Sequence, residues 1–292
     1  MKLLLNEKAV RSVGADGWLR VPPDTNQNQL DHSIPLPSEN GNTILMQELK
    51  TIDGATLLSS PMEPIRFVMD GLLAQGAYLL VGPPKKGKSW MALQICLAVA
   101  NGEQLWNLNV TQGDALYLCL EDNLNRIQNR LFDITDDAPP TIHFVTMCNG
   151  IGEGLAEQII MFTRRYPETK LVIIDTLQKV RGTQGDNAYA NDYDDAGAIK
   201  RIADQLGICI VMVHHTRKQK DSDPMNMISG TTGMPGAVDG YLILQNRKED
   251  KYATLYCNGR DIESRELKLA FQKDTHRWQL VADSVTEPEK FM

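Results

Sequence analysis

The residues most suited to chemistry lie in one short stretch near the middle of the first half of the chain. Residues 82–89 read Gly-Pro-Pro-Lys-Lys-Gly-Lys-Ser and match the phosphate-loop pattern G-x-x-x-x-G-K-[ST] at every fixed position. The glycines let the backbone curl so that its N–H groups point inward around phosphates. Such a loop predicts a site for ATP with Mg²⁺. The expected nucleotide-binding residues are Gly82, Pro83, Pro84, Lys85, Lys86, Gly87, Lys88, Ser89 and Trp90.

Two residues of this loop have roles that follow from their side chains. Lys88 would reach the β- and γ-phosphates, and the Ser89 hydroxyl would bind Mg²⁺. The loop follows an apolar run and precedes a helical pattern, which is the strand-to-helix context that the motif requires. The helix would add the positive end of its dipole to the phosphate site.

Carboxylates follow two other apolar runs. Asp175 ends the run at residues 171–174, which is the Walker B pattern, and it would hold Mg²⁺ directly or through water. Glu121 and Asp122 follow the run at residues 115–120. From the spacing alone, one of these two could polarise a water that attacks the γ-phosphate. They could equally cap a helix over residues 123–131.

A histidine pair follows the most apolar run in the chain. His214 and His215 come directly after residues 208–213, which read Ile-Cys-Ile-Val-Met-Val. A polar group at the end of such a strand can contact the γ-phosphate, although a histidine that only satisfies local hydrogen bonds is the simpler alternative. Which histidine faces the phosphate depends on the pleat of the strand.

Basic residues occur in two polar stretches that follow these strands. Arg217, Lys218 and Lys220 begin a long polar segment, and Arg181 begins a shorter one at residues 181–187. Such segments are most often solvated loops. The competing interpretation is contact with the phosphate backbone of a nucleic acid.

The elements that must position these residues alternate along the chain. Strands are expected at residues 77–81, 115–120, 142–145, 171–174 and 208–213, and helices at 89–100, 155–165 and 188–206. This alternation predicts an α/β fold with a mostly parallel sheet flanked by helices. After residue 238 strand patterns follow one another with short turns, which predicts antiparallel strands at the edge of the sheet. Their expected ranges are 240–244, 252–257, 266–271 and 278–281.

Length, composition and net charge limit the domain organisation and the class of protein. The chain has 292 residues, enough for one large domain with an appendage. Residues 1–60 are rich in Pro, Asn, Gln and Ser and predict a poorly ordered or extended arm, so the ATPase domain is expected at residues 61–292. The net charge of −7 argues against a surface that is basic throughout. Neither a signal peptide nor a membrane span is predicted, which favours a cytoplasmic protein.

The motifs together resemble a known group. In chain order they are the loop at 82–89, Glu121-Asp122, Asp175-Thr176, His214-His215-Thr216 and Asn258-Gly259-Arg260-Asp261. This series is similar to the RecA-type hexameric helicases and ATPases, in particular the plasmid RepA-like and DnaB-like P-loop ATPases. The resemblance covers roughly residues 61–275.

The resemblance implies roles and partners. It implies that Glu121 is the catalytic carboxylate, that Arg130 lies near the adenine, with Arg126 as the weaker candidate, and that one histidine senses the γ-phosphate. Arg260 would act as an arginine finger on the ATP of a neighbouring subunit, with Arg247 as its substitute. The implied assembly is a ring-like homo-oligomer, expected to be a hexamer, that acts on single-stranded DNA.

Two departures from the group bear on function. No arginine follows the Ser-Gly turn at residues 229–230, and no helical N-terminal domain is evident in the first part of the chain. The leading hypothesis is a ring-forming, DNA-dependent ATPase or helicase in the replication of a plasmid, phage or integrated element. The alternatives are a nucleotide-switched regulatory or scaffold ATPase that binds proteins, and a recombination or repair ATPase.

Overall fold

The computed structural model describes residues 49–181, 188–215, 233–246 and 251–291. The chain divides into two units, Met1–Met62 and Glu63–Met292. In the described residues, no helix is long and apolar enough to cross a membrane. The site lies in the second unit.

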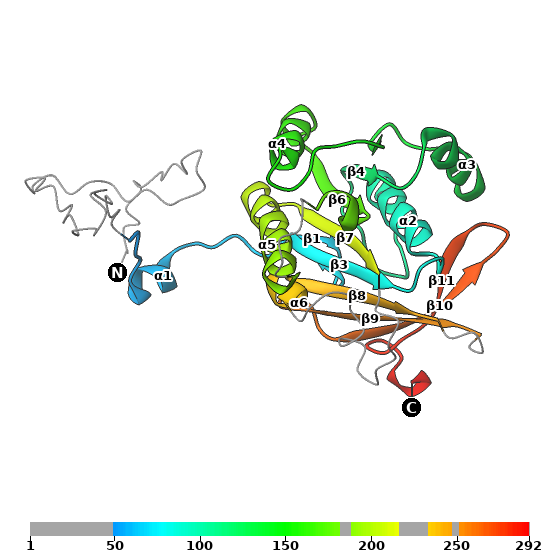
Figure 1. Ribbon diagram of the computed structural model, residues 1–292. Coiled ribbons are helices and arrows are strands. Elements are labelled where there is room, and N and C mark those ends of the chain that lie inside the picture. The colour runs from blue at the N-terminus through cyan, green and yellow to red at the C-terminus, as the bar shows by residue number, and fades with distance from the viewer. Residues whose placement is uncertain (1–48, 182–187, 216–232, 247–250, 292) are drawn as a thin grey trace, which may run out of the picture. The chain divides into compact units, whose positions relative to one another are not determined.

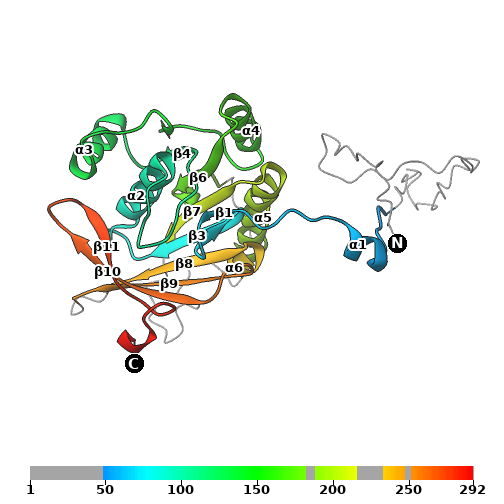
Figure 2. The ribbon, with the colours of Figure 1, turned by 180° about the vertical axis from the view of Figure 1, so that it is seen from behind.

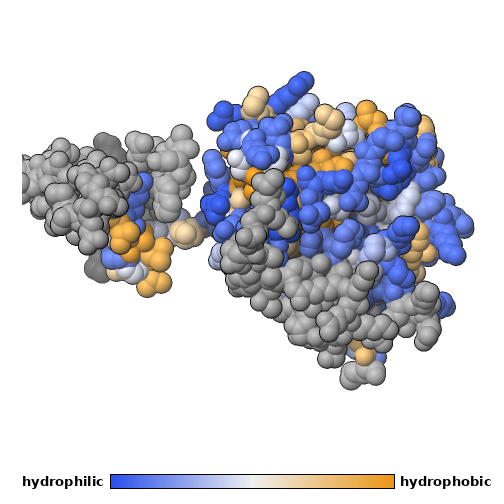
Figure 3. Space-filling view, viewed as in Figure 1, coloured by the Kyte–Doolittle hydropathy of each residue, from blue (hydrophilic) through white to orange (hydrophobic). Residues whose placement is uncertain are grey.

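The described part of the first unit contains a short helix, α1 (Gly54–Ser59), which was not expected from the sequence. Asp53 caps it by accepting a hydrogen bond from the Thr56 N–H at 2.9 Å. No residue of α1 is buried, and Leu57 and Leu58 are exposed. Figure 3 shows apolar surface on this part of the chain.

The second unit is built on one sheet of nine strands in the order β11-β10-β9-β8-β3-β7-β6-β4-β5. The strands from β8 to β5 run parallel, whereas β9, β10 and β11 are antiparallel (Figures 1 and 2). This is the predicted α/β fold with antiparallel C-terminal strands. The prediction was wrong for the strand expected at residues 240–244, because β8 lies inside the sheet and pairs in parallel with β3, and only its pairing with β9 is antiparallel. The parallel strands are β3 (Gly76–Gly82), β4 (Asp114–Cys119), β5 (Ile142–Val145), β6 (Thr169–Asp175), β7 (Cys209–His215) and β8 (Gly240–Gln245). The antiparallel ones are β9 (Ala253–Gly259), β10 (Arg265–Gln272) and β11 (Arg277–Asp283).

Burial explains why these sequences form these strands. Every residue of β3 is buried, and β6 and β7 are nearly continuous apolar runs, as expected for parallel strands that are covered on both faces. In β9 buried and partly exposed residues alternate, which is the pattern of an antiparallel strand with one solvated face. A small hairpin of β1 (Phe67–Met69) and β2 (Leu73–Ala74) was not predicted, because its strands are too short to show a period.

Helices cover both faces of the sheet. On one face α2 (Lys88–Asn101) and α3 (Leu124–Ile134) contribute buried residues to a core that also contains β1, β2 and Trp278. On the other face lie α4 (Leu155–Arg165), α5 (Ala188–Leu206) and α6 (Gly233–Ala237). Gly102, in the left-handed conformation, ends α2 close to the end predicted at residue 100. Short 3₁₀ helices occur at Leu177–Lys179 and Pro288–Lys290.

A buried carboxylate joins the amino ends of these parallel strands. Asp239 accepts hydrogen bonds from the Ala77 N–H at 2.9 Å and from Lys200 Nζ at 2.7 and 2.8 Å. Gly76, at φ +124°, passes so close that a Cβ there would lie 2.6 Å from Asp239 Oδ2. Asp239 therefore links β3 and β8 to helix α5.

We expect Asp239→Ala to lower the free energy of unfolding by about 2–3 kcal/mol, because it leaves a buried N–H unsatisfied and a lysine without its main partner. Urea unfolding would measure the loss. The matched control is Asp204→Ala, which removes the exposed partner of the same lysine and should cost less than about 0.5 kcal/mol. Equal losses in the two variants would contradict the role given to Asp239.

Candidate nucleotide site

The phosphate loop connects β3 to α2, and its two glycines are required for different reasons. Gly82 lies against β8, where a Cβ would come 2.8 Å from the Leu244 carbonyl oxygen. Gly87 has φ +87°, which favours glycine, and a Cβ there would lie 2.8 Å from Cζ2 of Trp278. The loop therefore leads directly into the N-terminal turn of α2, where free backbone N–H groups favour anions.

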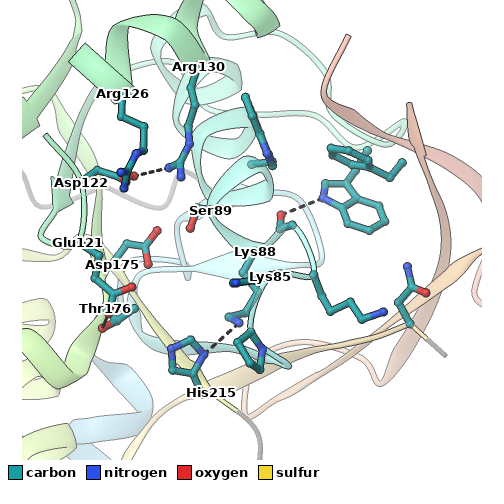
Figure 4. A pocket seen from close by; sticks show the side chains of 17 residues that line it. Lys85, Lys88, Ser89, Glu121, Asp122, Arg126, Arg130, Asp175, Thr176 and His215 are labelled. Atoms are coloured by element: carbon teal, nitrogen blue, oxygen red, sulfur yellow. Dashed lines mark hydrogen bonds and ion pairs between the residues drawn. The ribbon is translucent and has the colours of Figure 1, made fainter. Parts of the chain in front are cut away.

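Lys88 is almost completely buried at the centre of the site, with 5% of its surface exposed. Its ammonium donates hydrogen bonds to the carbonyl oxygens of Gly82 at 2.7 Å and Pro83 at 2.9 Å. A further contact of 3.3 Å joins Lys88 Nζ to His215 Nδ1 (Figure 4). Burial lowers the pKa of Lys88 to about 8, although the charges of Asp175 and Glu121 act in the opposite direction.

Of the two histidines, His215 is the one that lines the cavity. Burial and the neighbouring Lys88 charge lower its pKa, which favours the neutral imidazole. Because an ammonium can only donate, Nδ1 must be the acceptor and the proton belongs on Nε2. Side chains alternate along β7, so the buried His214 faces the opposite side of the sheet.

Asp175 ends β6 beside the loop and is held by two hydroxyl groups. Tyr117 Oη donates a hydrogen bond to Asp175 Oδ2 at 2.7 Å, and the Ser89 hydroxyl is a second hydrogen-bond partner. Burial raises the pKa of Asp175, and these hydrogen bonds lower it in part. Tyr117 was not predicted as a site residue, because it is a buried strand residue and no motif includes it.

Glu121 lies at the carboxyl end of β4 and lines the same cavity. The capping alternative does not hold, because the N-cap of α3 is Asn123, whose side chain accepts the Arg126 N–H at 2.9 Å. Glu121 instead accepts a hydrogen bond from Thr176 Oγ1 at 3.2 Å. Its carboxylate is thus placed on the Asp175 side of the cavity (Figure 4).

Arginines of α3 form another wall. Arg130 pairs with Asp122 and lies over the ring of Trp90, with Cζ 5.5 Å from the ring centroid. Arg126 pairs with the other oxygen of Asp122 at 2.8 Å. The Trp90 ring stacks on His276 from the turn between β10 and β11, with 4.4 Å between centroids. The Trp90 ring, which directly follows the phosphate loop, is therefore held between Arg130 and His276.

These groups enclose a cavity of about 730 Å³. Its inner surface combines loop lysines, strand-end carboxylates and aromatic rings, which together fit the phosphates, metal ion and base of a nucleotide. Ser89 and Asp175 supply the oxygen ligands that Mg²⁺ prefers. The lining residues are Pro84, Lys85, Lys86, Gly87, Lys88, Ser89, Trp90, Glu121, Asp122, Arg126, Arg130, Asp175, Thr176, His215, Asn246, Phe271 and Trp278.

Comparison with known proteins agrees with this geometry. A family model described as an AAA domain matches residues 45–221, more than half of the chain. The chain belongs to the AAA domain family. Nucleotide binding, typically with Mg²⁺, is what this family of P-loop ATPases implies, and the fold is that of the RecA-like ATPases.

Solved structures show the same fold at low identity. One solved ATPase domain has a TM-score of 0.59 at 14% identity, over 71% of this chain and 85% of that one. A DnaB-like replicative helicase, solved with its primase interactions, has a TM-score of 0.59 at 14% identity, over 74% of this chain and 61% of that one. A KaiC-like protein from Pyrococcus horikoshii has a TM-score of 0.54 at 11% identity, over 75% of this chain and all of that one.

Arg260 lies away from the cavity of its own ATPase domain. It follows β9, whose last residue pairs with Gly240 at the start of β8, so it is at the amino edge of the parallel strands. Its side chain is 57% exposed and lies 3.5 Å from Asp239. A contact with the ATP of a neighbour is not tested by a single chain and stays a prediction. Arg247 lies outside the described residues.

The predicted nucleic-acid contact of Arg181 is not supported. Only 7% of its side chain is exposed, and its guanidinium pairs with Asp192 and, at 2.8 Å, with Asp195 of α5. Both carboxylates neutralise the charge that a phosphate backbone would need. The other predicted contacts, Arg217, Lys218 and Lys220, lie outside the described residues.

We therefore expect Arg181→Met to destabilise the ATPase domain by about 3 kcal/mol, because it leaves buried carboxylates without their partner. Thermal or urea unfolding would measure this change. Lys179→Met, which removes an exposed charge two residues earlier, is the control and should change stability by less than about 0.5 kcal/mol. If Arg181→Met left stability unchanged but weakened DNA binding, the result would support the predicted nucleic-acid contact of Arg181 instead.

Proposed function

We propose that this protein is an ATP-hydrolysing RecA-like motor, a ring-forming, DNA-dependent ATPase or helicase in the replication of a plasmid, phage or integrated element. The observation that carries the hydrolytic part is the convergence of Lys88, Glu121, Asp175 and His215 on one cavity. The DNA-dependent part is supported by the likeness to the DnaB-like replicative helicase.

In the proposed site each side chain has a distinct task. Lys88 would exchange its backbone carbonyl partners for phosphate oxygens, and Ser89 with Asp175 would hold Mg²⁺, which neutralises charge on the phosphates. Glu121 would accept the proton of the attacking water. Arg130, which lies over Trp90, would offer the other face of its guanidinium to the base.

His215 would report the state of the phosphates. Its Nδ1 accepts from Lys88, so its Nε2–H remains as a donor for a phosphate oxygen. Movement of Lys88 toward phosphates would weaken this contact and shift the end of β7. The segment that follows β7 contains the predicted DNA-contacting residues Arg217, Lys218 and Lys220, so a connection between hydrolysis and DNA contact could pass through His215.

Mutations in the cavity should separate binding from cleavage. We expect Lys88→Ala to abolish nucleotide binding, and Glu121→Gln to bind ATP normally but hydrolyse it about 10²–10⁴-fold more slowly, since only proton transfer is lost. Steady-state phosphate release and calorimetric titration with ATP would measure both effects. Asp114→Asn, at the opposite end of β4, is the matched control and should behave like the wild type. Unimpaired hydrolysis by Glu121→Gln would contradict the catalytic role.

The motor hypothesis predicts oligomers and stimulation by DNA. Light scattering should show a ring-sized assembly, expected to be a hexamer, and single-stranded DNA should raise its ATP hydrolysis several-fold. Heparin is the control, because a polyanion without bases should not reproduce the effect if DNA is the true ligand. Slow turnover that ignores DNA would instead favour a nucleotide-switched scaffold or regulator.

A further inference from the structure

Trp278, from the C-terminal hairpin, contacts the last glycine of the phosphate loop. It lies in β11, is 2% exposed, and its indole N–H donates a hydrogen bond to the Gly87 carbonyl oxygen at 3.1 Å. Its ring fills the space where a Gly87 side chain would be. The AAA domain match ends at residue 221, so this contact comes from a part of the chain that the family match does not cover.

The backbone of Trp278 is fixed to the helix that the loop begins. The side chain of Gln94, in α2, accepts from the Trp278 N–H at 2.9 Å and donates to the Trp278 carbonyl oxygen at 3.0 Å. Trp106 Nε1 donates to the same carbonyl at 2.9 Å. The indole therefore has a defined place relative to α2, and it does not depend on the loop for its position.

The bonded carbonyl belongs to the peptide unit whose N–H is that of Lys88. In a planar trans peptide the C=O and N–H point in opposite directions, so fixing one fixes the other. The Gly87 carbonyl also accepts the Met91 N–H at 3.0 Å, which is the first turn of α2. Its carbonyl is thus held on the side of the hairpin and helix, and the Lys88 N–H is directed away from them.

We propose that Trp278 is a positioning residue that holds the Gly87–Lys88 peptide in its phosphate-binding orientation. The inference rests on the proposed binding of ATP at this loop. The β10–β11 hairpin would then contribute to nucleotide affinity as well as form one edge of the sheet. The bond is made to a carbonyl oxygen, so it uses none of the loop N–H groups that could bind phosphate.

The test compares two tryptophan-to-phenylalanine variants. Trp278→Phe keeps a ring but loses the donor to Gly87, and it should weaken binding of both ATP and ADP roughly three- to tenfold. Trp106→Phe removes one donor to the Trp278 carbonyl but leaves both Gln94 bonds to the Trp278 backbone in place, so it should leave both affinities unchanged at a comparable loss of stability. Calorimetric titration gives the affinities, and thermal unfolding gives the stabilities.

The other outcomes of this test would contradict either the positioning role of Trp278 or the proposed function. Wild-type affinity in a folded Trp278→Phe variant, or an equal loss in both variants, would overturn the positioning role. If Trp278→Phe does not fold, Gln94→Met removes the backbone anchor instead and should weaken nucleotide binding, and normal affinity there would overturn the role as well. A wild-type protein that binds neither ATP nor ADP would refute the proposed function itself, and normal wild-type binding beside an unaffected variant would refute only this inference.

Discussion

The site depends on keeping one positive charge out of water. Lys88 is 5% exposed, and an ammonium in such surroundings is costly unless oxygen or nitrogen acceptors replace its hydration. Backbone carbonyls at Gly82 and Pro83 and the ring of His215 supply those acceptors, and Asp175 and Glu121 supply opposite charge. The groups come from the ends of β3, β7, β6 and β4, so the order of the sheet is what makes the buried lysine tolerable.

That dependence explains how much of the site the sequence could predict. Parallel strands bring their carboxyl ends to one edge of a sheet, so polar residues that directly follow apolar runs are expected to meet there. Glu121, Asp175 and His215 obey this rule, because each follows an apolar run by at most two residues, whereas His214 faces the other side of the sheet. Lys88 was predicted from the phosphate-loop motif that follows such a run. Except for β8, which was expected among the antiparallel strands, the parallel strands were likewise predictable, since continuous apolar runs mark strands covered on both faces.

Features set by distant contacts could not be read in this way. No local pattern says that residue 278 will bond residue 87, or that Tyr117 will hold Asp175, since both contacts exist only after the sheet has formed. The basic character of Arg181 suggested a nucleic-acid contact. Asp192 and Asp195, three residues apart on one face of α5, were the available sign that the charge would instead be paired inside the protein.

The position of Arg260 limits how copies of the chain must meet if this arginine is to reach the ATP of a neighbour. Asp239 is shared between a buried network with Lys200 and a 3.5 Å contact with the exposed side of Arg260. Exposed ion pairs of this kind contribute at most about 1 kcal/mol, so Arg260 could exchange Asp239 for phosphate at little cost, and Lys200 would still neutralise the carboxylate. Because Arg260 and the cavity lie at opposite edges of the parallel strands, one copy must present its Arg260 edge to the cavity edge of the next. When such a head-to-tail contact repeats and its rotation closes, it forms a ring in which every cavity receives the Arg260 of a neighbour.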